Sequence, residues 1–97
     1  MMATISSDIL ASYAADAARE VDGVRGLVES ALHRRKGVRI VDEDGRVRVE
    51  LHLAVEWGVS IPEVGREVQH RVAAYLERMA KVDPEAVDVI VDEIGPQ

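Results

Sequence analysis

Cysteine is absent from this 97-residue sequence. That absence excludes a disulfide framework, a metal site built on thiolates and a cysteine nucleophile. The sequence also has no apolar run near the roughly 20 residues that a membrane-spanning helix needs. The residues after Met1 lack the basic region and apolar core of a signal peptide. We therefore expect a soluble, cytoplasmic protein that does not insert directly into a membrane.

Basic residues are in short supply, since Lys and Arg number 12 against 18 Asp and Glu, for a formal net charge of -6. This balance disfavours broad contact with nucleic acid or anionic lipid. The positive charge is concentrated in the segment His33-Arg34-Arg35-Lys36. We interpret this segment as a solvated loop, because so few charges are easily screened by salt. The alternative is contact of Arg34, Arg35 and Lys36 with an anionic surface.

Strict alternation of apolar and polar residues predicts a strand over residues 47–57, with one buried face. The apolar positions are Val47, Val49, Leu51, Leu53, Val55 and Trp57, and the polar face carries Arg48, Glu50, His52, Ala54 and Glu56. Trp57 is the sole tryptophan. We expect it in the core at the end of the sheet, and the alternative is a hot spot for a protein partner.

A second amphipathic segment begins after Gly58, where the hydrophobic period changes from two to about 3.6. Apolar residues at steps of three and four share one helical stripe, which we expect to be buried in the core, namely Ile61, Val64, Val68, Val72, Tyr75 and Met79. Ser60 and Glu63 have the spacing of a capping box. Pro62 falls in the first turn, where its missing N–H costs nothing. A helix therefore follows the strand directly.

The N-terminal part predicts another helix, running from Asp8 to about Val21, with Ser7 as its cap and Gly23 as its stop. Its inward stripe of mostly small residues is Leu10, Ala14, Ala17, Ala18 and Val21. Such small residues would let the helix approach a sheet closely. Residues 24–32 fit both a helical step and a strand, and we favour a strand.

The remaining segments complete a sheet. Asp42-Glu43-Asp44-Gly45 predicts a tight hairpin between residues 38–41 and the strand that begins at Val47. Alternating valines at Val87, Val89 and Val91 predict a final strand. The order of elements predicts one α+β domain over residues 1–97, a two-layer sandwich with two helices packed on one face of a small, mostly antiparallel sheet.

The usual constellations of catalytic and metal-binding residues are missing. His33, His52 and His70 do not have ligand spacing, so we interpret them as surface histidines. Carboxylates such as Glu50 and Glu56 fit a solvated face better than a catalytic pair. The serines form no nucleophile elbow, and no glycine pattern matches a phosphate-binding loop. We expect no enzymatic activity, no cofactor and no metal.

Two stretches of the sequence carry recognisable motifs. The first joins the long strand to the helix after it and consists of Val55-Glu56-Trp57-Gly58-Val59-Ser60-Ile61-Pro62-Glu63-Val64 with Gln69 and Val72. The second, Glu20-Val21-Asp22-Gly23-Val24, lies at the end of the first predicted helix. The first resembles the central strand-to-helix motif of the alkaline shock protein family of bacterial envelope stress proteins, and the second resembles the end of that family's first helix. The likeness covers nearly the whole chain, but Ala80-Lys81-Val82-Asp83-Pro84 stands where the family often has a glycine, and residues 26–37 are short and varied.

The resemblance implies a non-enzymatic protein of envelope stress or cell-envelope homeostasis. It implies self-association and a membrane-anchored protein partner, which would hold the chain at the periphery of the membrane. We expect the contact surface on the polar face of the long strand, at Arg48, Glu50, His52 and Glu56. An exposed sheet edge could add strands from another copy.

The alternative function is RNA binding. Gly23-Val24-Arg25-Gly26 matches the short Gly-x-x-Gly clamp of K-homology domains, which joins two helices beside a basic groove. Glu20, Asp22 and Glu29 surround the motif here. A helix stop followed by a turn is the favoured interpretation, because glycine is common at helix ends.

Overall fold

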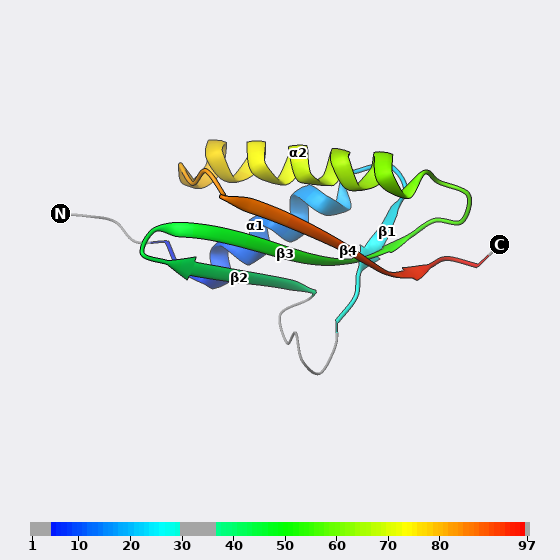
Figure 1. The fold of residues 1–97 in the computed structure, drawn as a ribbon, viewed down its shortest axis with the longest axis horizontal. Helices are drawn as coiled ribbons and strands as arrows, with labels where there is room; N and C mark the ends of the chain where they lie inside the picture. The colour runs from blue at the N-terminus through cyan, green and yellow to red at the C-terminus, as the bar shows by residue number, and fades with distance from the viewer. Residues whose placement is uncertain (1–4, 30–36, 97) are drawn as a thin grey trace.

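The computed structural model describes residues 5–29 and 37–96. Along the chain the elements are α1 (Ser7–Arg19), β1 (Val24–Leu27), β2 (Val38–Glu43), β3 (Arg46–Val55), α2 (Ile61–Ala80) and β4 (Ala86–Ile94) (Figure 1). Residues 24–27 thus form a strand, as we predicted, but residues 28 and 29 lie beyond its end. Residues 30–32 of that prediction lie outside the described residues.

Helix α1 is capped by Ser6, whose hydroxyl accepts a hydrogen bond from the Ile9 N–H at 3.2 Å. The prediction of Ser7 as the cap was wrong by one residue. The helix also ends at Arg19, two residues before the predicted end at Val21. Its inward stripe is confirmed, because the five predicted residues are all at most 4% exposed.

Strand β3 is the centre of the sheet, because it pairs on both sides. Strands β1 and β2 lie antiparallel to it end to end on one side, and β4 lies parallel to it on the other. Leu51 faces Val38 on β2 and Val89 on β4. A mostly antiparallel sheet is thereby confirmed. The parallel pairing arises because α2 carries the chain back along the sheet before β4 begins.

The β2–β3 hairpin closes through a turn at Asp44 and Gly45, whose φ angles are 54° and 84°. Positive φ at both central positions is the geometry that matches the twist of paired strands. The Asp42 carboxylate accepts a hydrogen bond from the Gly45 N–H at 3.1 Å. The predicted hairpin is confirmed.

Helix α2 buries the middle of its predicted stripe. Val64, Val68 and Val72 are at most 8% exposed, and so is Leu76, which the prediction omitted. Ile61 and Met79 are 39% and 44% exposed, so their assignment to the core was wrong. Both lie on the same stripe but at the two ends of the helix, where fewer neighbours cover them.

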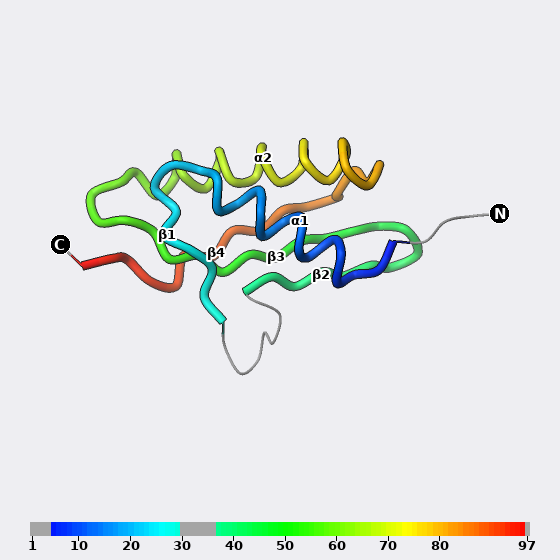
Figure 2. Tube along the Cα trace, turned by 180° about the vertical axis from the view of Figure 1, so that it is seen from behind, coloured from blue at the N-terminus to red at the C-terminus, as the bar shows by residue number. Residues whose placement is uncertain are grey.

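Both helices lie on the same face of the sheet. Seen from behind in Figure 2, α1 crosses β2 and β3, and α2 runs alongside it. Tyr13 of α1 and Tyr75 of α2 meet edge to face, with ring centroids 5.7 Å apart. The inward residues of β3, from Val47 to Val55, are at most 5% exposed and complete the core. The two-layer α+β sandwich is confirmed.

The cap of α2 provides a test of the local structure. The Ser60 hydroxyl accepts a hydrogen bond from the Glu63 N–H at 3.4 Å. Ser60→Ala removes this acceptor, and we expect the free energy of unfolding to fall by about 1 kcal/mol. Ser60→Asp keeps an acceptor and should retain most of the stability. Urea unfolding followed by circular dichroism measures both, and equal losses for the two variants would contradict the capping role.

Candidate protein-contact surface

Within residues 5–29 and 37–96, no helix covers the other face of the sheet, and we call this face the open face. It is turned toward the viewer in Figure 1. Alternation along β2, β3 and β4 places a mixture of charged and apolar side chains on it. These residues are Arg39, Val41, Arg48, Glu50, His52, Asp88 and Ile90, with Asp92 beside His52.

His52 lies between two carboxylates on the open face. Its Nδ1 is 2.7 Å from Asp92 Oδ2 on β4, and its Nε2 is 2.9 Å from Glu50 Oε2 on β3. A carboxylate only accepts hydrogen bonds, and an imidazole donates from both nitrogens only when it is protonated. The arrangement therefore fits a positively charged His52 that ties β3 to β4.

The pKa of His52 reflects these neighbours. Burial lowers the pKa, but the hydrogen bonds to Glu50 and Asp92 and the charges of both carboxylates together raise it above its ordinary value of 6.5. The side chain is 11% exposed, so water screens these interactions only in part. Our interpretation of His52 as a surface histidine was therefore wrong, and the Glu50 side chain, at 27% exposed, is not fully solvated either.

Arg48 extends the charged surface toward the start of β4. Its guanidinium lies 3.6 Å from the Asp88 carboxylate, and both side chains are about half exposed. Arg39 on β2 is the strand partner of Glu50 and is also exposed. Charges of both signs thus lie on neighbouring strands, with Glu50 between Arg39 on β2 and Asp88 on β4. Arg48, Glu50 and His52 lie together as we predicted.

Glu56 is separate from these three residues. It follows the end of β3, its side chain is exposed, and its N–H donates to the Gly23 carbonyl at 2.8 Å. The predicted contact surface therefore divides into the open face and a second region around Glu56. Arg34, Arg35 and Lys36, the predicted anionic-surface contact, lie outside the described residues.

Trp57 belongs to that second region. Its side chain is 58% exposed, so its predicted place in the core was wrong. Strand β3 ends at Val55, and Gly58 has a φ angle of 89° in the turn that follows. The turn takes the indole out of the alternation that the sequence suggested.

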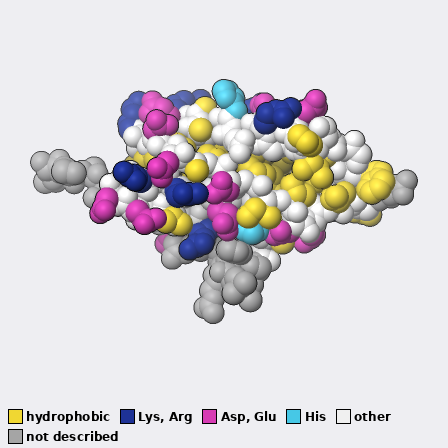
Figure 3. Space-filling model, viewed as in Figure 1, with side chains coloured by type: hydrophobic (Ala, Val, Ile, Leu, Met, Phe, Trp, Pro, Cys, Tyr) yellow, Lys and Arg dark blue, Asp and Glu magenta, His cyan; other side chains and the backbone are white. Residues whose placement is uncertain are grey.

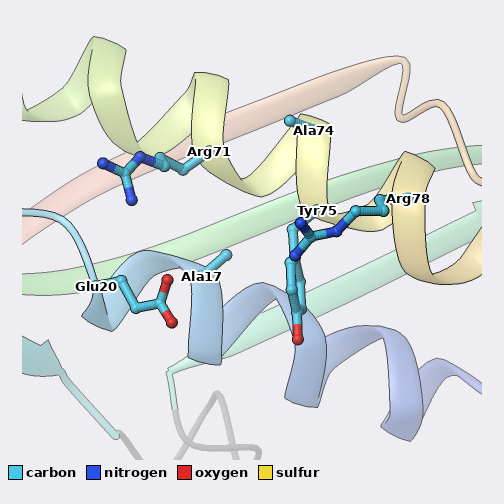
Figure 4. A pocket seen from close by; sticks show the side chains of 6 residues that line it. All are labelled: Ala17, Glu20, Arg71, Ala74, Tyr75 and Arg78. Carbon is cyan, nitrogen blue, oxygen red and sulfur yellow. The ribbon is translucent and has the colours of Figure 1, made fainter.

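A shallow groove lined by charged residues lies between the two helices. It has a volume of about 280 Å³, and Ala17, Glu20, Arg71, Ala74, Tyr75 and Arg78 line it (Figure 4). Arg71 is paired with Glu67 at 2.9 Å, and the Arg78 guanidinium stacks 5.2 Å from the centre of the Tyr75 ring. Both cations therefore already have partners within the chain.

The described residues offer little for other chemistry. Within residues 5–29 and 37–96, no three or more His, Asp or Glu side chains are grouped so that they could hold a metal ion. In the same part of the chain, neither helix combines the length and apolar character that crossing a membrane requires. Gly23-Val24-Arg25-Gly26 runs from the end of α1 into β1. It therefore lacks the two-helix setting of the K-homology clamp.

Comparison with known families adds an independent observation. The model of the alkaline shock protein family matches residues 2–96 and confirms the resemblance. The description of this family is a cell envelope-related function. An uncharacterized protein of Streptococcus pyogenes serotype M6, Spy1614, is 28% identical over 102 residues, which cover 93% of this chain and 84% of that protein. The uncharacterized protein YqhY of Bacillus subtilis is 28% identical over 95 residues, which cover 88% of this chain and 70% of that protein.

Solved structures share the fold at low sequence identity. A manganese form of a MamM CTD variant aligns with a TM-score of 0.60 and 17% identity, over 91% of this chain and 99% of that chain. A copper form of another MamM CTD variant aligns with a TM-score of 0.63 and 16% identity, over 94% of this chain and 100% of that chain. At such identities the likeness establishes the arrangement of helices and strands alone.

Proposed function

Because this chain belongs to the alkaline shock protein family, whose function is cell envelope-related, we propose that it is a non-enzymatic protein of envelope stress and cell-envelope homeostasis. It acts by self-association and by binding a membrane-anchored protein, which holds it at the cytoplasmic side of the membrane. The chain supplies the contact surface, and its partner supplies the anchor.

The charged open face is the observation that supports this proposal best. His52, Glu50 and Asp92 form a network that spans β3 and β4, and Arg48 and Asp88 continue it. Charges fixed by neighbouring strands are well suited to selecting a partner with the complementary pattern, because electrostatic complementarity contributes specificity and association rate. We assign the membrane-anchored partner to this face.

Charge reversal on the open face tests the assignment. In this proposal Arg48 pairs with an acidic group of the membrane-anchored partner. We therefore expect Arg48→Glu to weaken binding to that partner at least about tenfold, because two like charges would then oppose each other. The measurement is recovery of the tagged chain with washed membranes from its native cell, followed by titration of the partner identified there. Arg66→Glu on the exposed side of α2 is the matched control and should bind as the unchanged chain does.

The same experiment separates a protein anchor from a lipid surface. Treatment of the membranes with protease should abolish recovery if a protein holds the chain. Recovery on protein-free anionic vesicles, or equal binding by the Arg48→Glu variant and the unchanged chain, would contradict the proposal. Recovery of RNA without any membrane protein would favour the alternative function.

A further inference from the structure

Three of the seven exposed large hydrophobic side chains in the described residues lie together at one end of the molecule, which we call the Trp57 end. Trp57 is 58% exposed, Ile94 52% and Ile61 39%. They lie where β3 leads into α2 and where β4 ends, and Figure 3 shows hydrophobic side chains clustered toward that end. An exposed tryptophan and two exposed isoleucines that lie together form an apolar patch, and such patches on a protein surface usually mark a binding site.

The backbone holds the Trp57 end in a defined shape. The Glu56 N–H donates to the Gly23 carbonyl at 2.8 Å, and the Gly95 N–H donates to the Val55 carbonyl at 2.6 Å. Val59 packs so closely over Gly23 that an added Cβ there would lie 3.3 Å from its side chain. These contacts fix the chain on both sides of Trp57. An indole that is presented by an ordered turn loses little freedom when it binds.

Hollows flank Trp57 on two sides. One has a volume of about 260 Å³ and is mostly apolar, and Val55, Glu56, Trp57, Gly58, Val59, Ile61 and Ile94 line it. The other has a volume of about 380 Å³, and Arg25, Glu56, Trp57, Gly95 and Pro96 line it. Sites for drug-sized ligands span about 300–1,000 Å³. The apolar hollow is therefore better matched to a single large side chain.

The features of the Trp57 end complement one another. A protruding aromatic side chain lies beside a hollow that could receive one, and a cation, Arg25, and an anion, Glu56, border the same region. Neither of these two side chains has an ion pair within the described residues. A contact with two-fold symmetry requires such a patch, because each feature must meet its complement on an identical surface.

We propose that the Trp57 end is the contact between two copies of this chain. Each Trp57 enters the hollow beside Ile61 and Ile94 of the other copy, and each Arg25 faces the other copy's Glu56. This inference rests on the self-association in the proposed function and assigns it a surface distinct from the open face. Tryptophan at the centre and charges at the rim are the usual anatomy of a strong contact.

The intrinsic fluorescence of the sole tryptophan tests the contact directly. In a dilution series, the Trp57 emission of the unchanged chain should move to shorter wavelength as concentration rises, in step with dimer formation in analytical ultracentrifugation. Ile94→Ser should raise the dissociation constant at least about tenfold and delay the shift equally. Trp57→Ala has no tryptophan emission and is therefore followed by sedimentation alone, and it should raise the dissociation constant at least about tenfold as well. Ile9→Ser is the matched control, because Ile9 on α1 is 46% exposed against 52% for Ile94, and it should change neither the dissociation constant nor the fluorescence shift.

Charge exchange distinguishes this contact from non-specific association. Arg25→Glu and Glu56→Arg should each weaken the dimer, and the double variant should recover most of the loss. Circular dichroism must show an intact fold in every variant. Dimers that persist in Trp57→Ala but dissociate in Arg48→Glu would overturn this surface and leave self-association standing. A chain that is monomeric at all concentrations would overturn both the contact at the Trp57 end and self-association. Recovery with membranes would then still test binding to the membrane-anchored partner.

Discussion

Leu51→Ala is expected to lower the free energy of unfolding by about 2–5 kcal/mol, the largest loss among the substitutions considered. Leu51 is 0% exposed and lies in the middle of β3, between Val38 and Val89. Shortening the Leu51 side chain leaves a cavity. The neighbouring strands β2 and β4 would have to move inward to fill it. Since a domain of this size is stable by about 5–15 kcal/mol, one such cavity consumes a large share of the total.

The loss should appear in urea unfolding as a midpoint lowered by about 2 M, given a denaturant dependence near 1–2 kcal/mol per M. Circular dichroism is the suitable signal, because Trp57 is already exposed in the folded chain. Leu51→Met keeps the volume and should cost less than about 1.5 kcal/mol. A loss below about 1 kcal/mol for Leu51→Ala would show that β3 is not the centre of a packed core.

His52→Gln is expected to destabilise the fold in a pH-dependent manner, by about 1–3 kcal/mol near pH 6 and by less near pH 9. The folded-state pKa of His52 is raised above 6.5 by its carboxylate neighbours despite the opposing effect of burial. The stabilisation by protonated His52 is therefore fully present below pH 6.5 and is lost as the pH rises through the raised value. Alkaline conditions then leave one ring nitrogen without a proton against a carboxylate.

Two measurements check this expectation. Titration of the histidine ring signals by NMR should give a pKa above 6.5 for His52, and Asp92→Asn should lower it. Unfolding curves from pH 6 to pH 9 should then approach one another for the unchanged chain and the His52→Gln variant. His70→Gln, on the exposed side of α2, is the matched control. An unshifted His52 or a constant difference between the curves would contradict the charged network.

The sequence was sufficient to predict the elements whose signal is local. The alternation of apolar and polar residues from Val47 to Val55 fits a strand and not a helix. Asp44-Gly45 predicts a hairpin turn, because few residue types adopt a positive φ angle. The middle of the buried stripe of α2, at Val64, Val68 and Val72, followed from its spacing. The boundary of β3 was less accessible, because Trp57 continues the alternation in sequence although Val55 is the last strand residue. Only the turn through Gly58, seen in three dimensions, places the indole outside.

The composition of the candidate surface depended on pairings between distant residues. Asp92 is 40 residues from His52, and the register between β3 and β4 shifts near Leu53 and Ala54. No periodicity in the chain shows that β4 lies parallel to β3 or where such a shift falls. The sequence therefore placed Arg48, Glu50 and His52 on one face. It could not show that a carboxylate from β4, that of Asp92, forms a hydrogen bond with His52.

The position of β4 beside β3 also sets the order in which the fold can assemble. The β2–β3 hairpin closes through a two-residue turn, whereas α2 separates β4 from β3 in the sequence. We therefore expect the hairpin to form first and β4 to dock after α2. Closing a short loop is fast. Pairing of strands that are distant in sequence is slow, because the chain loses the conformational entropy of the intervening loop before the stabilising contacts form. During that interval one side of β3 has its amide groups unpaired, which makes the unfinished chain most prone to aggregate just before β4 docks.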